Sequence, residues 1–250
     1  MNYKFSILLF LIVITNIFSQ ERILNIEYDF YFKDYFPESM KISLISNGKQ
    51  SLSTLTRTIY NKNLNSFEAE LTSYYKHYYK TKDSILSEEE LDDKKFFVKE
   101  PLDQFEWKLT GNTKTILNYV CQEATVSFRG RNYFAYFTSK IPFRVAPWKF
   151  HGLPGAMLAI STDDENIKIE AQSIKFERFS GTIGNPYFKV ENTITWQNFV
   201  DLAIKNWQDF KNRVTSQAQS LSNSQRMSMG MPKISPSLRM EIIIEQNGNN

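Results

Sequence analysis

The alternation of apolar and polar residues after position 21 constrains the fold of this chain more than any other feature. In the stretch RILNIEYDFYF, every second residue from Leu24 to Phe32 is apolar, and Asn25, Glu27 and Asp29 occupy the positions between. A period of two is typical of a strand with one buried and one exposed face. The sequence therefore predicts a sheet that covers a core on one side.

Further strands are predicted in antiparallel order, because turn signals separate them. Asn47-Gly48, a strong hairpin signal, stands between KISLIS and SLSTLTRTIY. The acidic stretch after Asp83 is expected to form a surface loop with solvated carboxylates. Additional strands are expected at 67–80, 105–110, 119–128, 133–142, 156–161 and 167–177.

One helix is predicted at 196–214. Thr195 is a suitable N-cap, and behind it apolar residues recur at steps of three and four. These residues are Trp196, Phe199, Val200, Ala203, Ile204, Trp207, Phe210 and Val214. The predicted fold class is α+β: a predominantly antiparallel, curved sheet with one long C-terminal amphipathic helix packed on it.

The two ends of the chain differ in composition from its middle. Residues 1–20 carry Lys4 as their only charge and an apolar run too short for a membrane anchor, which indicates a signal peptide. Residues 21–214 are predicted to form a single β-rich domain. Residues 215–239 are expected to be a flexible polar segment, and 240–250 a final strand and tail. We expect an exported protein, periplasmic or extracellular, with no transmembrane segment in the mature chain.

The cysteine count excludes an intramolecular disulfide, and the distribution of charge limits the kinds of partner that the chain can bind. Cys121 is the only cysteine, so no intramolecular disulfide can form, and we expect it to be a buried strand residue. Residues 83–106 hold nine acidic residues and three lysines, whereas 124–162 hold five basic residues and no acidic one. This asymmetry indicates either a basic face for an anionic partner or two segments that face each other. Export argues against nucleic acid as the partner.

The segment 140–155 is the best specified loop of the chain. Pro154 presets φ near −65° and Gly155 tolerates a positive φ, so Leu153-Pro154-Gly155-Ala156 is predicted to form a type II turn. Gly152 adds freedom just before it. The motif Gly152, Leu153, Pro154 and Gly155 is therefore interpreted as a structural corner that leads into an inner strand.

Four side chains make this loop a candidate binding site: Arg144, Trp148, Lys149 and His151. Together they can stack on and neutralise a peptide carboxylate or a sugar phosphate. No catalytic residue, metal site or cofactor is predicted. The chain has only two histidines and one cysteine, and it lacks zinc-ligand spacings, a Gly-x-Ser-x-Gly motif and a Gly-rich phosphate loop.

The stretch TKTILNYVCQEATVSFRGRNYFAYFTSKIPFRVAPWKFHGLPGAMLAI resembles the GLPGLI family of exported Bacteroidetes proteins. Ala156-Met157 replaces the Leu-Ile of the family motif. The resemblance implies export and supplies no catalytic residue. The strand order is also similar to that of the curved half-barrel of lipoprotein carriers such as LolA, a fold-level analogy that does not imply function. The residues that carry the family pattern are Trp107, Cys121, Ala124, Arg129, Gly130, Arg131, Tyr133, Phe137, Ile141, Pro142, Pro147, Phe150 and Gly152–Gly155.

Three functions stay open at this stage. The first is an exported, non-enzymatic cell-envelope protein that binds an apolar, peptide or envelope ligand, or an outer-membrane partner protein. The second is a hydrolase of peptides or glycans with His151 as general base, which requires a Ser, Thr, Asp or Glu within hydrogen-bond reach. In the third, the motif is purely structural and binds no ligand.

Overall fold

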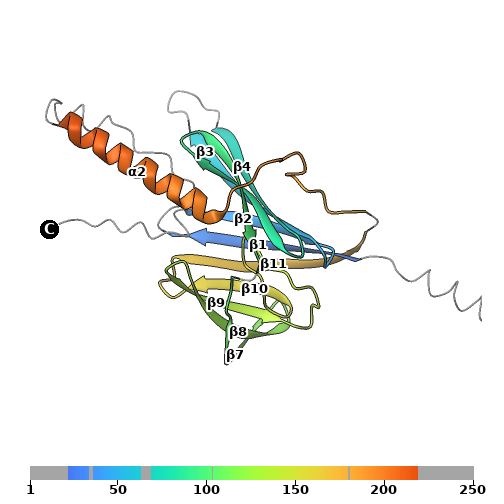
Figure 1. The fold of residues 1–250 in the computed structure, drawn as a ribbon. Helices are drawn as coiled ribbons and strands as arrows, with labels where there is room; N and C mark the ends of the chain where they lie inside the picture. The colour runs from blue at the N-terminus through green and yellow to red at the C-terminus, as the bar shows by residue number, and fades with distance from the viewer. Residues whose placement is uncertain (1–21, 34–35, 63–68, 103, 180, 219–250) are drawn as a thin grey trace, which may run out of the picture.

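The computed structural model describes residues 22–33, 36–62, 69–102, 104–179 and 181–218. The predicted signal peptide, most of the polar segment and the predicted final strand lie outside these ranges. Within them the chain forms one antiparallel sheet of eleven strands and a single C-terminal helix (Figure 1). The predicted antiparallel sheet with one C-terminal helix is therefore confirmed.

The strand order places the first and last of the described strands side by side in the middle of the sheet. The order is β6-β5-β4-β3-β2-β1-β11-β10-β9-β8-β7, so two meanders extend outwards from the β1–β11 pair. Figure 1 shows that the strands change direction across the sheet, which is strongly twisted. The strands are β1 (Arg22–Phe32), β2 (Phe36–Ser46), β3 (Ser51–Lys62), β4 (Ala69–Lys80), β5 (Ser84–Leu91), β6 (Lys94–Pro101), β7 (Lys108–Ile116), β8 (Tyr119–Phe128), β9 (Arg131–Thr138), β10 (Ala156–Thr162) and β11 (Ile167–Arg178).

The alternation in β1 does place one face in the core. Every apolar residue from Leu24 to Phe32 that shares this face is buried. Ile23, on the other face, is buried as well, because it packs with Tyr79, Ile183 and Tyr187. The segment that follows β11 therefore covers part of the second face of the sheet.

The acidic stretch after Asp83 is a strand, so its prediction as a surface loop is wrong. β5 buries Ile85, Ser87, Glu89 and Leu91 on one face, and Glu89 is fully buried. A carboxylate is buried in a protein only when cations or donors compensate it. Those partners come from other strands and from the β9–β10 loop, and the local sequence does not reveal them.

The helix α2 (Trp196–Ala218) packs on the sheet only through its first turns. Thr195 caps it, since the Asn198 N–H donates to Thr195 Oγ1 at 3.1 Å. Trp196, Phe199 and Ala203 then pack against Leu91, Phe96 and Val98.

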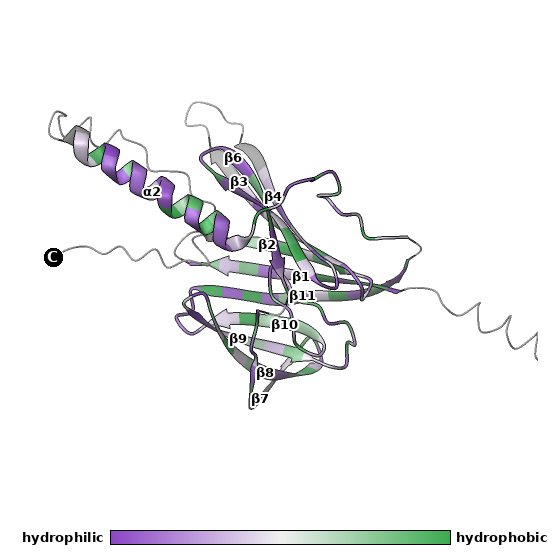
Figure 2. Cartoon of the chain, viewed as in Figure 1, coloured by the Kyte–Doolittle hydropathy of each residue, from purple (hydrophilic) through white to green (hydrophobic). Residues whose placement is uncertain are grey.

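The rest of α2 extends away from the sheet, as Figure 1 shows, and Figure 2 shows apolar residues along this part as well. Ile204, which the periodicity placed on the packed face, is 47% exposed. The predicted packing of the helix on the sheet thus holds for its first turns, whereas Ile204 does not lie on a covered face. No helix in the described ranges is both long and apolar enough to cross a membrane.

The Gly152–Gly155 motif forms a tighter turn than the predicted type II turn. The Gly155 N–H donates to the Leu153 carbonyl at 2.9 Å, and this i→i+2 bond defines a γ-turn centred on Pro154. Val145 flanks the turn, donating to the Gly155 carbonyl at 3.3 Å and accepting from the Met157 N–H at 2.9 Å. The turn leads directly into β10, which lies between β9 and β11. The corner into an inner strand is thus confirmed, although its turn class differs.

Candidate functional site

The structure buries three of the four predicted binding residues. Trp148, Lys149 and His151 are 1%, 0% and 9% exposed, and Arg144 is exposed. Trp148 adopts a left-handed backbone with φ of 52°, and its ring packs edge-on against Phe150. Trp148 therefore belongs to the core, where we expect it to contribute to stability.

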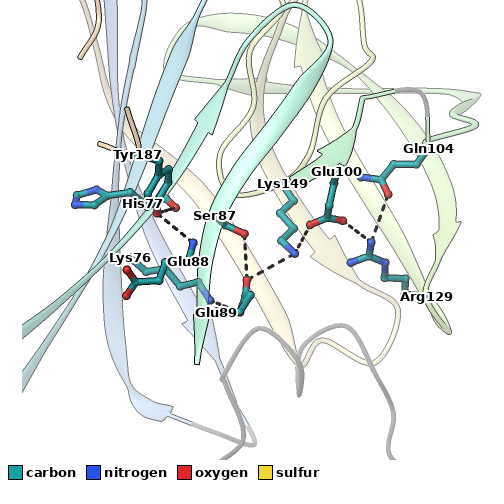
Figure 3. A network of polar contacts seen from close by, with 10 residues as sticks. All are labelled: Lys76, His77, Ser87, Glu88, Glu89, Glu100, Gln104, Arg129, Lys149 and Tyr187. Carbon is teal, nitrogen blue, oxygen red and sulfur yellow. Dashed lines mark hydrogen bonds and ion pairs between the residues drawn. The ribbon is translucent and has the colours of Figure 1, made fainter. Parts of the chain in front are cut away.

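Lys149 enters a buried network of ion pairs between the loop and the strands β4–β6 (Figure 3). Its Nζ lies 2.6 Å from Glu100 Oε1 and 3.9 Å from Glu89 Oε1. Arg129 bonds the second oxygen of Glu100 at 2.5 Å, and Lys76 bonds the second oxygen of Glu89 at 2.6 Å. Each buried carboxylate is thus bridged by two cations, so the acid-rich and the acid-free segments face each other here.

The charges of this network stabilise one another, and Lys149 thereby ties the loop to β5 and β6. Burial lowers the pKa of Lys149 to about 8, against the opposing effect of the two carboxylates. Burial alone would raise the pKa of Glu100, but Lys149 and Arg129 hold it below its ordinary value. The Trp196 ring lies over both cations, with its centroid 3.8 Å from Lys149 Nζ and 4.3 Å from Arg129 Cζ. The first residue of α2 therefore covers the network.

Lys80, at the end of β4, holds the same loop from another direction. Its Nζ donates to the carbonyl oxygens of Ala146 and Phe150, each at 2.7 Å. Lys80 is 5% exposed, and burial lowers its pKa to about 7. Sequence reasoning missed Lys80, although it shares the phase of buried Tyr78 on β4. That phase was the only available signal.

Small polar residues lie beside Lys80 on the neighbouring strands. Ser46 on β2 is paired with Ser51 on β3, and Ser51 is paired with Lys80 on β4. Residues directly opposite one another share a face of the sheet, and both serines are buried. This row forms a polar floor whose short side chains leave space above it.

A pocket of about 650 Å³ adjoins this floor. Four cations line it: Lys49 from the β2–β3 turn, Lys80, Lys82 from the β4–β5 turn, and Arg144 from the loop. None of the described residues that line the pocket carries a carboxylate. A concave site lined by charges of one sign concentrates ions of the opposite sign, so this pocket is suited to an anion.

His151 forms part of the pocket wall. Its Nδ1 lies 3.2 Å from the Lys149 carbonyl oxygen, and its ring packs edge-on against Phe105. The Trp107 indole N–H donates to the His151 carbonyl oxygen at 2.8 Å. These contacts fix the orientation of the ring. Of the four predicted binding residues, the structure thus brings Arg144 and His151 to one pocket and places Trp148 and Lys149 in the core.

Cys121 is a buried residue of β8, as predicted. Burial raises the pKa of its thiol to about 11, which disfavours the reactive thiolate. In the described part of the chain, no cluster of three or more His, Cys, Asp or Glu side chains is arranged to hold a metal ion.

No family model matches the sequence, and no curated protein matches it. Among solved structures, the fold is similar to that of PNGF-II in two crystal forms, with TM-scores of 0.47 and 0.45 and sequence identities of 15% and 16%. The match covers 74% of this chain and 34% or 33% of the PNGF-II chains, so this chain spans about a third of their length. At these TM-scores the likeness says nothing about function.

Proposed function

We propose that the protein is an exported, non-enzymatic binding protein of the cell envelope that captures a small ligand through a carboxylate or phosphate group in the pocket beside Lys80. The observation that carries the proposal is the buried Lys80 ammonium. It has three N–H donors, and the Ala146 and Phe150 carbonyls accept two of them. Among the described residues no acceptor takes the third and no carboxylate pairs with the charge, which makes burial costly. A bound anion would supply the third acceptor and the opposite charge.

The surroundings of Lys80 support the same ligand chemistry. Arg144 is exposed and lines the pocket, and its planar guanidinium can bind a carboxylate or a phosphate through two parallel hydrogen bonds. Lys49 and Lys82 add positive charge from the two adjoining turns. A volume of about 650 Å³ is within the range of small-molecule sites. Of the ligand classes open from the sequence, the anionic ones fit this pocket best.

The remaining parts of the proposal depend on the sequence. The leader at 1–20 supports export, and the pattern from Trp107 to Gly155 supports membership of the GLPGLI family. Cell fractionation of the producing organism tests the first point: the protein should be found in the periplasm or outside the cell, without residues 1–20. Retention of the full-length chain in the cytoplasm would contradict it.

The binding proposal is tested by calorimetric titration at low salt with succinate, inorganic phosphate and neutral glycerol. We expect the two anions to bind and glycerol not to bind. Arg144→Ala should weaken anion binding about tenfold, because a charge-assisted hydrogen bond contributes about 1.5–3 kcal/mol. Arg144 is exposed, so this variant should fold.

Lys41→Ala provides the matched control, since Lys41 is an exposed cation on β2 that does not line the pocket. It should bind like the wild type. If both variants bound the anions equally weakly, the loss would come from the lower overall charge and not from the pocket. No anion binding by the folded wild type would overturn the proposal and favour a purely structural motif. Peptide or glycan turnover that His151→Ala abolishes would favour the hydrolase instead.

A further inference from the structure

Lys80 differs from the other buried lysine of the loop region in what surrounds its nitrogen. Lys149 lies between two carboxylates, Glu100 and Glu89. Lys80 has two carbonyl oxygens at 2.7 Å, and within the described ranges no carboxylate pairs with it. Carboxylates stabilise an ammonium ion far more than carbonyl groups do. Lys80 therefore loses its proton more readily than Lys149 does.

Near pH 7 Lys80 can be an ammonium ion or a neutral amine, and when no anion contacts Nζ the two carbonyl acceptors fully satisfy the neutral amine. A neutral lysine nitrogen has two N–H groups and one lone pair, so Ala146 and Phe150 accept both hydrogens. The lone pair then occupies the remaining tetrahedral direction and is available to an electrophile in the pocket. Burial, which lowers the pKa of Lys80 to about 7, favours the same form. A desolvated lysine beside other cations is a recurrent way to obtain a nucleophilic amine.

The charged groups around Lys80 select the kind of electrophile. Lys49 and Lys82 extend from two turns, Arg144 and His151 from the loop, and all four line the same pocket. Asp83 lines an adjoining hollow that shares Lys49 and Lys82. Glu100, which shares the face of Lys80 across Ile85, is paired with Lys149 and Arg129. The cations disfavour a proton on Lys80 and attract an anion. A carboxylate held at Arg144 would leave an adjacent aldehyde or ketone carbon for Lys80.

We propose that Lys80 is a nucleophilic lysine that forms an imine with small 2-oxo carboxylates bound in this pocket. The proposal rests on the anion-binding function above. The Nζ lone pair attacks the carbonyl carbon, and a C–N bond forms while the carbonyl π electrons move to oxygen. That oxygen takes up one proton from the nitrogen. The C–O bond then breaks, oxygen leaves as water with the second nitrogen proton, and a C=N bond remains.

Reductive trapping tests this chemistry on the folded protein. Pyruvate and sodium cyanoborohydride are added at pH 7, and the hydride converts an imine into a stable secondary amine. Intact-mass analysis and peptide mapping then locate the label. We expect one carboxyethyl group at Lys80, formed at least about tenfold faster than at exposed Lys41, because burial lowers the pKa of Lys80 to about 7 and leaves part of its amine neutral at pH 7. If only exposed lysines of the wild-type protein were labelled, the proposal would be wrong, and no variant would be needed to show it.

Two controls separate the imine from simple binding. Propionate has the carboxylate but no reactive carbonyl, so an excess should slow labelling of Lys80 and leave Lys41 unchanged. Lys80→Arg replaces the amine with a basic group that forms no imine and should abolish the pocket label, whereas Lys41→Arg should not change it. If pyruvate binds by calorimetry but Lys80 stays unlabelled, the imine is wrong and the anion-binding function stands. If neither propionate nor pyruvate binds, both proposals are wrong.

Discussion

Gly155 has almost no free space around its α-carbon. Its φ is +155°, and a Cβ added there would lie 2.2 Å from the Thr138 carbonyl oxygen and 2.7 Å from the carbonyl carbon. Both atoms belong to the backbone at the end of β9, so no side-chain rotation can relieve the contact. A glycine at this position is therefore required by the close approach of two chain segments.

Gly155→Ala is expected to lower the free energy of unfolding by about 3 kcal/mol, because overpacking adds to backbone strain. Gly111→Ala is the matched control. Gly111 also has a positive φ, of +86°, but nothing lies within 4 Å of an added Cβ, so only the backbone cost of about 1 kcal/mol applies. Urea denaturation of the three proteins measures the difference. Equal losses in the two variants would show that the close contact contributes nothing.

At individual residues, sequence reasoning succeeded where the constraint is local. Pro154 and Gly155 predict a turn through their own backbone preferences, but these preferences do not predict the Gly155–Leu153 hydrogen bond that sets the turn class. The environments of Lys80 and Lys149 could not be predicted. The carbonyls that bind Lys80 lie 66 and 70 positions along the chain, and the carboxylates around Lys149 come from β5 and β6.

Among the secondary-structure elements, those with a clear period were the predictable ones. β1 and the start of α2 follow from alternation and from three- and four-residue spacing. β5 was missed, because carboxylates on a strand indicate solvent unless their distant cations are known. The extent of helix packing was also missed. An apolar stripe marks the face that can pack, but it does not reveal where the sheet beneath it ends.

Phe199 and Ile204 allow a direct test of how far α2 packs. Phe199 is fully buried against Phe96 and Trp196, so Phe199→Ala is expected to lower the free energy of unfolding by about 3 kcal/mol. Ile204 is 47% exposed, and Ile204→Ala should change it by no more than about 0.5 kcal/mol. Chemical denaturation followed by circular dichroism checks both values. A large loss for Ile204→Ala would mean that the helix is covered where the structure shows it exposed.

For the molecule as a whole, the buried lysines link stability to pH. Burial lowers the pKa of Lys80 to about 7 and that of Lys149 to about 8, whereas an unfolded lysine keeps its proton until about pH 10.4. Between pH 7 and 10 the unfolded chain thus binds more protons, so stability rises with pH in that window. The pKa of Glu100 is lowered, so its contribution is present above its unfolded pKa and is lost as the pH falls through its folded value.

Urea midpoints measured from pH 4 to pH 10 should therefore be lowest in acid and rise through the neutral range. Each lysine contributes at most about 1.4 kcal/mol per pH unit between its folded and unfolded pKa. Lys80→Met should flatten the rise that begins near pH 7, and Lys41→Met should leave it unchanged because Lys41 is exposed. If the free energy of unfolding of the wild type fell steadily from pH 7 to 10, the buried lysines would not be neutral in the folded protein.

The pairing of β1 with β11 has a consequence for how the chain acquires its structure. Arg22 lies opposite Arg178, so the central pair joins the first and the last strand of the described sheet. The flanking meanders can form early from neighbouring hairpins, whereas the β1–β11 pair cannot form until the ribosome has released β11. Such a high contact order predicts slow maturation. A growing chain is therefore expected to lack its central strand pair until residue 178 has been made.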